Sequence, residues 1–262
     1  MLDDLDAERL RGRIEGRWGA SLTVVPSTAS TMDDAAEAAR AGAVDGHVVL
    51  ADRQTRGRGA HGRDWVSPGG TDLYFSIVAR PNVEPSAMAL ITLATGLGVR
   101  DAVAELLPDR EVVVKWPNDI WIEGKKCAGI LVESRMLGTR IEAVVIGVGL
   151  NVNRSEWPPE LRGLATSVKA ERNGEAPLDR GDVFGRVLAK IERWVQRFSR
   201  DGASVLVDAL RPHLALVGTE VRWENGRGVF EGIDEQGAAL VRTNEGVVTL
   251  HAARIEPLEQ AG

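Results

Sequence analysis

A run of apolar segments separated by tight turns, between residues 111 and 150, constrains the fold more than any other part of the chain. Glu123-Gly124 and Gly138-Thr139 are turn signals between successive segments. Consecutive strands joined by such turns form an antiparallel meander. The expected strands are Glu111–Lys115, Ile120–Ile122, Lys126–Ser134 and Ile141–Leu150.

Helices and further strands precede and follow this meander. The spacing of apolar residues predicts a short opening helix over 1–18, an alanine-rich helix over 32–41, a helix from Pro85 to just before Pro108, and a long helix starting near Asp182. The long helix carries an apolar stripe that ends at Phe198, so we expect it to pack on the sheet. Further strands are predicted at Leu22–Val25, Gly46–Ala51 and Asp72–Ala79. The chain therefore predicts an α+β fold, a central mixed or antiparallel sheet flanked by helices.

The character of the sequence changes near Pro212. Four short β-like runs follow Val217, separated by turn signals at Asn225-Gly226, Gln236-Gly237 and Glu245-Gly246. We predict a first domain over 1–212 and a small β-barrel-like module over 213–262. A module of about 50 residues is near the lower limit for a self-sufficient core, so we expect it to pack on the first domain.

Composition excludes several classes of function. A net charge of −6 and an isoelectric point near 5.4 argue against nucleic-acid binding. The single cysteine, Cys127, excludes an internal disulfide and fits a reducing compartment. We find no apolar stretch near the ~20 residues of a membrane span and no signal-peptide pattern, so we expect a cytoplasmic protein. No phosphate-loop motif, Cys/His metal spacing or Gly-x-Ser-x-Gly elbow is present.

The segment Arg53–Trp65 is the first candidate for chemistry. It holds four arginines and three glycines in thirteen residues. Glycine lets the backbone approach a ligand closely, and arginine presents a planar fork of donors for phosphate or carboxylate. The alternative is a solvated surface loop.

Three other stretches carry candidate groups, each with a plainer alternative. Lys115–Asp119 presents an amide and a carboxylate at a proline-stiffened corner, or is a simple turn. Lys125-Lys126 begins a hairpin strand, where lysines are usually solvated. Two glycines interrupt the β run Ile146–Asn153, which often marks the close approach of a ligand. For Ser30 and Thr31, composition alone favours helix capping.

Taken together and in this order, these stretches resemble the biotin protein ligases, also called holocarboxylase synthetases. The resemblance covers most of residues 22–153, and the C-terminal part looks like the family's small β domain. It implies the class II synthetase-like fold of biotin and lipoate ligases, with an SH3-like C-terminal barrel. The motifs are Ser30-Thr31-Met32, Gln54–Trp65, Ser67-Pro68, Leu73–Ser76, Lys115–Asp119, Lys125–Glu133, Gly147–Asn151 and Gly232–Gly237.

The resemblance implies a two-step reaction. Biotin and magnesium-ATP form biotinyl-5′-AMP and pyrophosphate, and a lysine of a biotin carboxyl carrier protein then attacks the mixed anhydride. Lys126, Arg63 and Asp119 are the implied catalytic residues, with Asp119 orienting or deprotonating the incoming lysine. We predict no protein ligand to the metal, because Mg²⁺ arrives on the phosphates of ATP.

The same resemblance implies two sets of binding residues. The biotin side is expected to contain Ser30, Thr31, Gln54, Gly57, Arg58, Lys126, Gly129, Leu131 and Gly147. The adenylate side is expected to contain Arg58, Arg63, Trp65, Asn118, Lys126 and Asn151.

The sequence departs from the family pattern in the loop. Where relatives read Gly-Arg-Gly-Arg, Ala60 takes the place of the second arginine, which predicts weaker retention of the adenylate. Arg56 stands where a small residue is usual, and nothing explains it beyond one more positive charge. We expect the loop over 53–68 to be disordered or mobile without ligand.

Other readings stay open at this point. Catalytic motifs begin by residue 30, so we expect no DNA-binding domain and no repressor activity. Lipoate or octanoate transfer is the nearest alternative activity, and a biotin sensor without turnover is the alternative from another class. Relatives occur as monomers and as homodimers, and the sequence does not decide between them.

Overall fold

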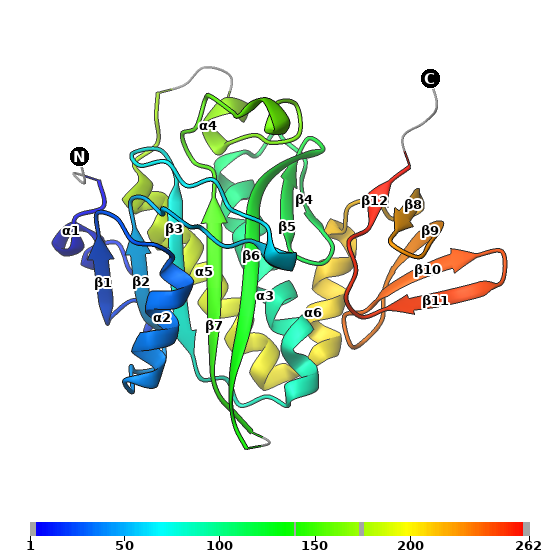
Figure 1. The fold of residues 1–262 in the computed structure, drawn as a ribbon, viewed down its shortest axis with the longest axis horizontal. Coiled ribbons are helices and arrows are strands. Elements are labelled where there is room, and N and C mark those ends of the chain that lie inside the picture. The colour runs from blue at the N-terminus through cyan, green and yellow to red at the C-terminus, as the bar shows by residue number, and fades with distance from the viewer. Residues whose placement is uncertain (1–3, 139, 173–175, 259–262) are drawn as a thin grey trace.

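The computed structural model describes residues 4–138, 140–172 and 176–258, and these residues form two sheets with flanking helices (Figure 1). The first sheet has seven strands in the order β1-β2-β3-β7-β6-β5-β4. All neighbours pair antiparallel except β1 and β2, which are parallel. The predicted mixed sheet is confirmed. Its strands are β1 (Leu22–Val25), β2 (His47–Ala51), β3 (Leu73–Ala79), β4 (Val112–Lys115), β5 (Asp119–Ile122), β6 (Lys125–Leu137) and β7 (Arg140–Leu150).

The predicted meander forms one half of this sheet, β4 to β7 in chain order. The β5–β6 turn has positive φ at Glu123 (49°) and Gly124 (76°), the conformation that a tight two-residue hairpin requires. Thr139, half of the second predicted turn, lies outside the described residues. Strand β6 is longer than predicted, because it continues past Ser134 in partnership with β7.

Helices cover both faces of the sheet. Helix α2 (Thr31–Arg40) lies on one face, where its buried Met32, Ala35 and Ala39 pack on Val49 and other strand residues. Helices α3 (Met88–Leu106) and α5 (Arg180–Asp201) cover the other face (Figure 1). The backbones of α3 and α5 come close where Gly98 faces Ile191, because a Cβ at Gly98 would lie 2.7 Å from the Ile191 Cα.

From the sequence we expected no apolar stretch long enough to span a membrane, and helix α3 shows that this expectation was wrong. With the turn before it, the segment Pro85–Leu106 is long enough and apolar enough to span a membrane, with a mean hydropathy of 1.4. Eleven residues of α3 from Leu90 to Val103 are buried between the sheet and α5. Its apolar composition is that of a core helix.

The predicted opening helix is wrong in extent. Between residues 4 and 18 the structure has only α1 (Ala7–Arg11), capped by Asp6, whose carboxylate accepts from the backbone N–H of Glu8 and Arg9. Gly12 follows at the helix end, and Leu2 lies outside the described residues. Two helices were not predicted, α4 (Val168–Glu171) and α6 (Ala203–Leu210), and short 3₁₀ turns occur at Ala60–Gly62, Pro85–Ala87, Pro159–Leu161 and Arg211–His213.

The second sheet is antiparallel and has one strand more than predicted. Its order is β11-β10-β9-β8-β12. Two of its turns lie one residue before the predicted pairs, because Gly226 and Gly246 are the first residues of β9 and β11, and the third turn includes Gln236-Gly237 as predicted. It packs on the first sheet as expected, since Trp116 donates from Nε1 to the Gly237 carbonyl (2.9 Å) and Phe230 joins the main core. The domain boundary after residue 212 stays a prediction. The strands are β8 (Glu220–Trp223), β9 (Gly226–Ile233), β10 (Ala239–Thr243), β11 (Gly246–Leu250) and β12 (Glu256–Pro257).

Candidate active site

A small cavity of about 30 Å³ lies on the α2 side of the sheet, covered by the loop between β2 and β3. Nine of the predicted site residues line it, contributed by α2, the loop, the β4–β5 turn, β6 and β7. They are Thr31, Gln54, Arg58, Trp65, Asn118, Lys126, Gly129, Leu131 and Gly147.

Polar groups at one end of the cavity form a connected network. Gln54 Oε1 accepts from the Thr31 backbone N–H (2.9 Å) and from its hydroxyl (3.2 Å), and Gln54 Nε2 donates to Ser67 Oγ (2.9 Å). The buried Ser76 donates from its hydroxyl to Thr31 Oγ1 (2.9 Å). These side chains are fixed by one another, so they present a preorganised polar surface.

The structure contradicts the interpretation of Ser30 and Thr31 as capping residues. Ser30 stands at the N-cap position of α2, but its side chain makes no capping hydrogen bond, and its buried Oγ has no partner. The amide of Gln54, 23 residues away, accepts from the first helical N–H instead. The Ser30 hydroxyl therefore does not cap the helix and remains available next to the cavity.

Trp65 lies against two glycines of adjacent strands. A Cβ would lie 2.8 Å from the indole at Gly129 on β6 and 2.5 Å from it at Gly149 on β7. Any larger residue at either position would therefore collide with the ring. The indole Nε1 is buried and has no hydrogen-bond partner among the residues that the structure describes.

Lys126 and Asp119 meet beside this ring. Lys126 Nζ lies 2.6 Å from Asp119 Oδ1 and 5.1 Å from the centre of the Trp65 ring. Both side chains are largely buried, with 27% and 11% of their surface exposed, so their charges are weakly screened. Lys115 lies beside Asp119, and burial lowers the pKa of its amine. Asn118 donates from Nδ2 to the Ile130 carbonyl (2.9 Å), which fixes the corner against β6.

The covering loop is folded on itself and attached at both sides. Within it, Gly59 N donates to the Arg63 carbonyl (2.7 Å) and Trp65 N to the Gly57 carbonyl (2.8 Å). Arg58 forms ion pairs with Asp33 on α2 (2.8 Å) and with Glu133 on β6. The arginine predicted to bind the ligand is thus held by two carboxylates across the cavity. Mobility of the loop without ligand stays a prediction.

Five predicted residues lie outside the cavity lining. Ser30 is fully buried next to Thr31 in the sequence, and Asp119 contacts the cavity-lining Lys126 without lining the cavity itself. Gly57 lies under the loop, with no space for a Cβ beside the Trp65 carbonyl (2.4 Å). Arg63 is exposed and donates to the Ala60 carbonyl (3.3 Å), and Asn151 donates from Nδ2 to the Thr166 carbonyl (3.0 Å). The binding roles of these residues stay predictions.

Sequence reasoning left out some of the lining. Met32 fills the space above Gly147, where a Cβ would lie 2.5 Å from its sulfur. Gly149 could have been identified, because it is the second glycine of the β7 run. The remaining residues, Gly59, Ala60, Ile130 and Val148, either belong to the loop already singled out or alternate with identified residues along β6 and β7.

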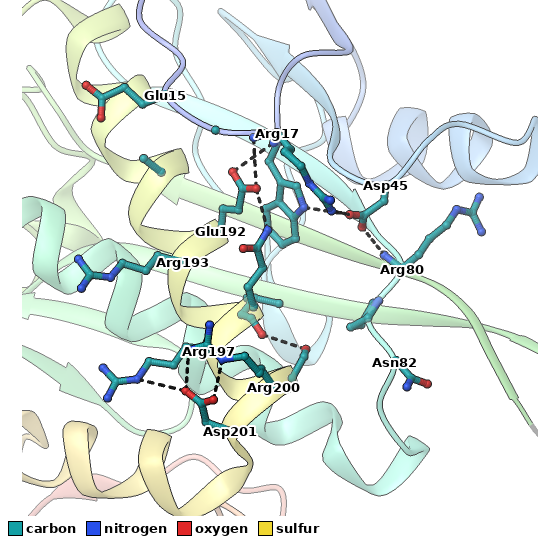
Figure 2. Close-up of a pocket in the computed structure, with 17 residues that line it drawn as sticks. Glu15, Arg17, Asp45, Arg80, Asn82, Glu192, Arg193, Arg197, Arg200 and Asp201 are labelled. Atoms are coloured by element: carbon teal, nitrogen blue, oxygen red, sulfur yellow. Dashed lines mark hydrogen bonds and ion pairs between the residues drawn. The ribbon is translucent and has the colours of Figure 1, made fainter.

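A larger cleft of about 980 Å³ lies on the opposite face, beside α5 (Figure 2). Two acids of the cleft stabilise the fold. The buried Glu192 accepts from the backbone N–H groups of Arg17 and Trp18 (both 3.2 Å), and the partly exposed Asp45 accepts from that of Arg80 (2.8 Å). Arg200 pairs with Asp201 (2.6 Å). The cleft contains none of the predicted site residues.

Comparisons with known proteins agree with the fold and the cavity. A family model described as the biotin/lipoate A/B protein ligase family matches residues 24–151, and one described as the biotin protein ligase C terminal domain matches residues 222–256. The first match contains every predicted site residue. The fold and site therefore define a protein of the biotin and lipoate ligase class.

Individual relatives show to which family within this class the chain belongs. The biotin–[acetyl-CoA-carboxylase] ligase of Mycobacterium tuberculosis is 34% identical over 262 residues, covering 96% of this chain and 95% of the relative. The bifunctional ligase/repressor BirA of Bacillus subtilis is 34% identical over 87% of this chain and 71% of its own length. The biotin protein ligase from Aquifex aeolicus, solved in complex with biotin and ATP, superposes with a TM-score of 0.78 at 28% identity, covering 91% of this chain and all of that chain. The chain belongs to the biotin protein ligase family.

Proposed function

We propose that this chain activates biotin with magnesium-ATP to biotinyl-5′-AMP and transfers the biotin to a lysine of a biotin carboxyl carrier protein. The observation that carries the proposal is the meeting of Lys126, Asp119 and Trp65 at one cavity whose other end is a fixed polar network. The Aquifex relative was solved with both biotin and ATP, which supports the two substrates.

In the first step the biotin carboxylate attacks the α-phosphorus, and pyrophosphate leaves. Both reacting groups are anionic, so the reaction needs a cation between them. Lys126 is suited to this role, because its ammonium group lines the cavity and is weakly screened by solvent. Thr31 and Gln54 would bind the ureido ring of biotin through their fixed donors and acceptors.

In the second step the carrier lysine attacks the acyl carbon, and AMP leaves. The amine must lose a proton to become a nucleophile, and Asp119 is a carboxylate within the reaction centre that can accept it. Asp119→Asn, tested with preformed adenylate, is expected to slow transfer at neutral pH. An unchanged transfer rate would remove Asp119 from this role.

Magnesium enters the proposal only as part of the substrate. Within 4–138, 140–172 and 176–258, no group of three His, Cys, Asp or Glu residues could hold a metal ion. Mg²⁺ commonly retains several waters and binds through substrate phosphates, so magnesium-ATP needs no such protein site.

We further propose a ligase without repressor activity, acting in the cytoplasm. The M. tuberculosis relative, named only as a ligase, matches along 95% of its length, and the net charge of −6 disfavours DNA binding. A gel-shift assay tests the first point, since sequence-specific DNA binding would contradict it. The sequence leaves a monomer and a homodimer open, and light scattering distinguishes the two.

The first experiment mixes the purified chain with magnesium-ATP and biotin, lipoate or octanoate, and measures the acyl-adenylate by mass spectrometry. Biotinyl-adenylate formed from biotin alone is the expected result. A lipoyl- or octanoyl-adenylate would overturn the assignment of the pocket to biotin. Tight biotin binding without any adenylate would instead favour a sensor.

A further inference from the structure

Two backbone carbonyls directly after Trp65 are held by buried side chains to which no role has yet been assigned: Arg154, which lies outside the motifs above, and Tyr74, which belongs to the motif Leu73–Ser76. Arg154, which follows β7, is 4% exposed and donates from Nη2 to the Val66 carbonyl (2.8 Å). Tyr74 on β3 is fully buried, and its hydroxyl lies 3.0 Å from both the Pro68 carbonyl and Asp72 Oδ2, so these two acceptors share its one proton. The segment 66–68 is therefore fixed at both ends.

The two anchoring side chains are themselves fixed by a buried carboxylate. Asp72 accepts from Arg154 Nε (2.7 Å) and from the Val152 backbone N–H (2.9 Å). Arg154 also donates to the Tyr74 hydroxyl oxygen (2.9 Å) and lies 5.0 Å from the centre of the Trp157 ring. The charges of Asp72 and Arg154 compensate each other inside the protein. Burial raises the pKa of Tyr74, so its hydroxyl remains a donor at neutral pH.

The anchored segment is continuous with the active site. Ser67, between the two anchored carbonyls, donates from its hydroxyl to the Trp65 carbonyl (2.9 Å) and accepts from Gln54 (2.9 Å). Gln54 is held independently by Thr31 on α2 (2.9 Å). The Trp65 indole has no hydrogen bond of its own, so its position depends on the backbone on either side of it.

We propose that Arg154 and Tyr74 are positioning residues that fix the segment 66–68 and thereby place the Trp65 indole against Gly129 and Gly149. This rests on the proposed function, in which Trp65 forms a wall of the nucleotide site. Loosening the anchor affects the nucleotide more than biotin, because the biotin-side residues Thr31 and Gln54 remain bonded to each other.

The test compares Tyr74→Phe with Thr95→Val. Each removes one buried hydroxyl that donates to a backbone carbonyl, and Thr95 donates to Ile91 (2.8 Å) inside α3, away from the cavity. Tyr74→Phe is expected to raise the KM for ATP and the rate of adenylate release about fivefold, the factor for one net hydrogen bond of about 1 kcal/mol. The Kd for biotin should change less than twofold.

Arg154→Lys gives a second measurement. It keeps the charge next to Asp72 but cannot reach all the acceptors of the guanidinium fork, so the same kinetic changes should be larger. Both variants are expected to lose thermal stability, and Thr95→Val measures how much of the kinetic change a loss of stability alone produces.

The possible outcomes distinguish a failure of this inference from a failure of the proposed function. Suppose that the wild-type chain forms the adenylate, and that Tyr74→Phe and Arg154→Lys have the same KM for ATP and the same rate of adenylate release as Thr95→Val. The inference would then be wrong, and the proposed function would be unaffected. Equal effects on ATP and biotin would also overturn it. A wild-type chain that forms no adenylate would overturn the proposed function and this inference with it.

Discussion

Replacing Lys126 by methionine is the sharpest test of how the cavity works. Methionine keeps the unbranched side chain that packs near Trp65 and removes the charge. A hydrogen bond to a charged group is worth about 1.5–3 kcal/mol. The change also leaves Asp119 unpaired, and a carboxylate about 4 Å from a phosphate oxygen costs up to about 4 kcal/mol at the effective dielectric constant of a protein surface. We therefore expect adenylate formation to slow at least about 100-fold, or about 2.7 kcal/mol.

The neighbouring lysine provides the control. Lys125 is 43% exposed and lies 3.5 Å from Glu171, so Lys125→Met removes a charge at nearly the same place without touching the cavity. Single-turnover formation of biotinyl-adenylate, measured by quenched flow, is expected to be within about threefold of wild type in this variant, because Lys125 does not line the cavity and its half-exposed ammonium group is screened by solvent.

A double variant separates catalysis from stability. Lys126→Met alone should destabilise the fold, because Asp119 keeps a largely buried charge without its partner. Adding Asp119→Asn removes that charge, so the melting temperature should recover while adenylate formation stays slow. Rapid adenylate formation in Lys126→Met, or a recovery of activity in the double variant, would refute the reasoning.

Three further predictions follow from other parts of the structure. Gly98→Ala should lower the melting temperature by several degrees, because its Cβ would meet the α5 backbone at 2.7 Å, whereas Gly96→Ala, with its nearest neighbour at 3.6 Å, should be tolerated in the same scan. Burial lowers the pKa of His47, so the unfolded chain binds more protons and stability should fall as pH drops below 6.5; melting curves of His47→Gln should show a smaller loss, and an equal loss would contradict this. Ala60 lines the cavity, so Ala60→Arg should slow adenylate release about tenfold or more in a chase experiment, and an unchanged release rate would show that retention does not depend on this position.

The parts of the site that the sequence could predict lie on the meander. A tight turn at Glu123-Gly124 joins β5 to β6, so Asp119 and Lys126 had to lie near each other on paired strands. The glycines of β6 and β7 were recognisable because glycine weakens a strand unless something approaches its face. In this structure the Trp65 indole approaches both Gly129 and Gly149. Local pattern and pairing rules were sufficient for these residues.

The role of Ser30 and Thr31 was not predictable in this way. A hydroxyl residue before a helix is a good cap in most proteins, and local sequence contains no sign that a distant side chain will replace it. Gln54, at the start of the β2–β3 loop and 23 residues from Thr31, accepts from the first helical N–H instead. The helix start and the ligand-facing loop are thereby tied together by a contact that depends on the tertiary fold.

The position of the covering loop depends on a buried ion pair between Asp72, at the end of the loop, and Arg154, which is distant in sequence. Arg154 and Asp72 are 82 residues apart, and each alone reads as an ordinary surface charge. Burying either one without the other would be costly, so the pair is stable only when β3 and β7 are adjacent. Once paired, Arg154 has donors left over, and one of them binds the Val66 carbonyl. The loop motif contains the glycines and arginines of the site, and contacts with buried residues of the core fix their positions.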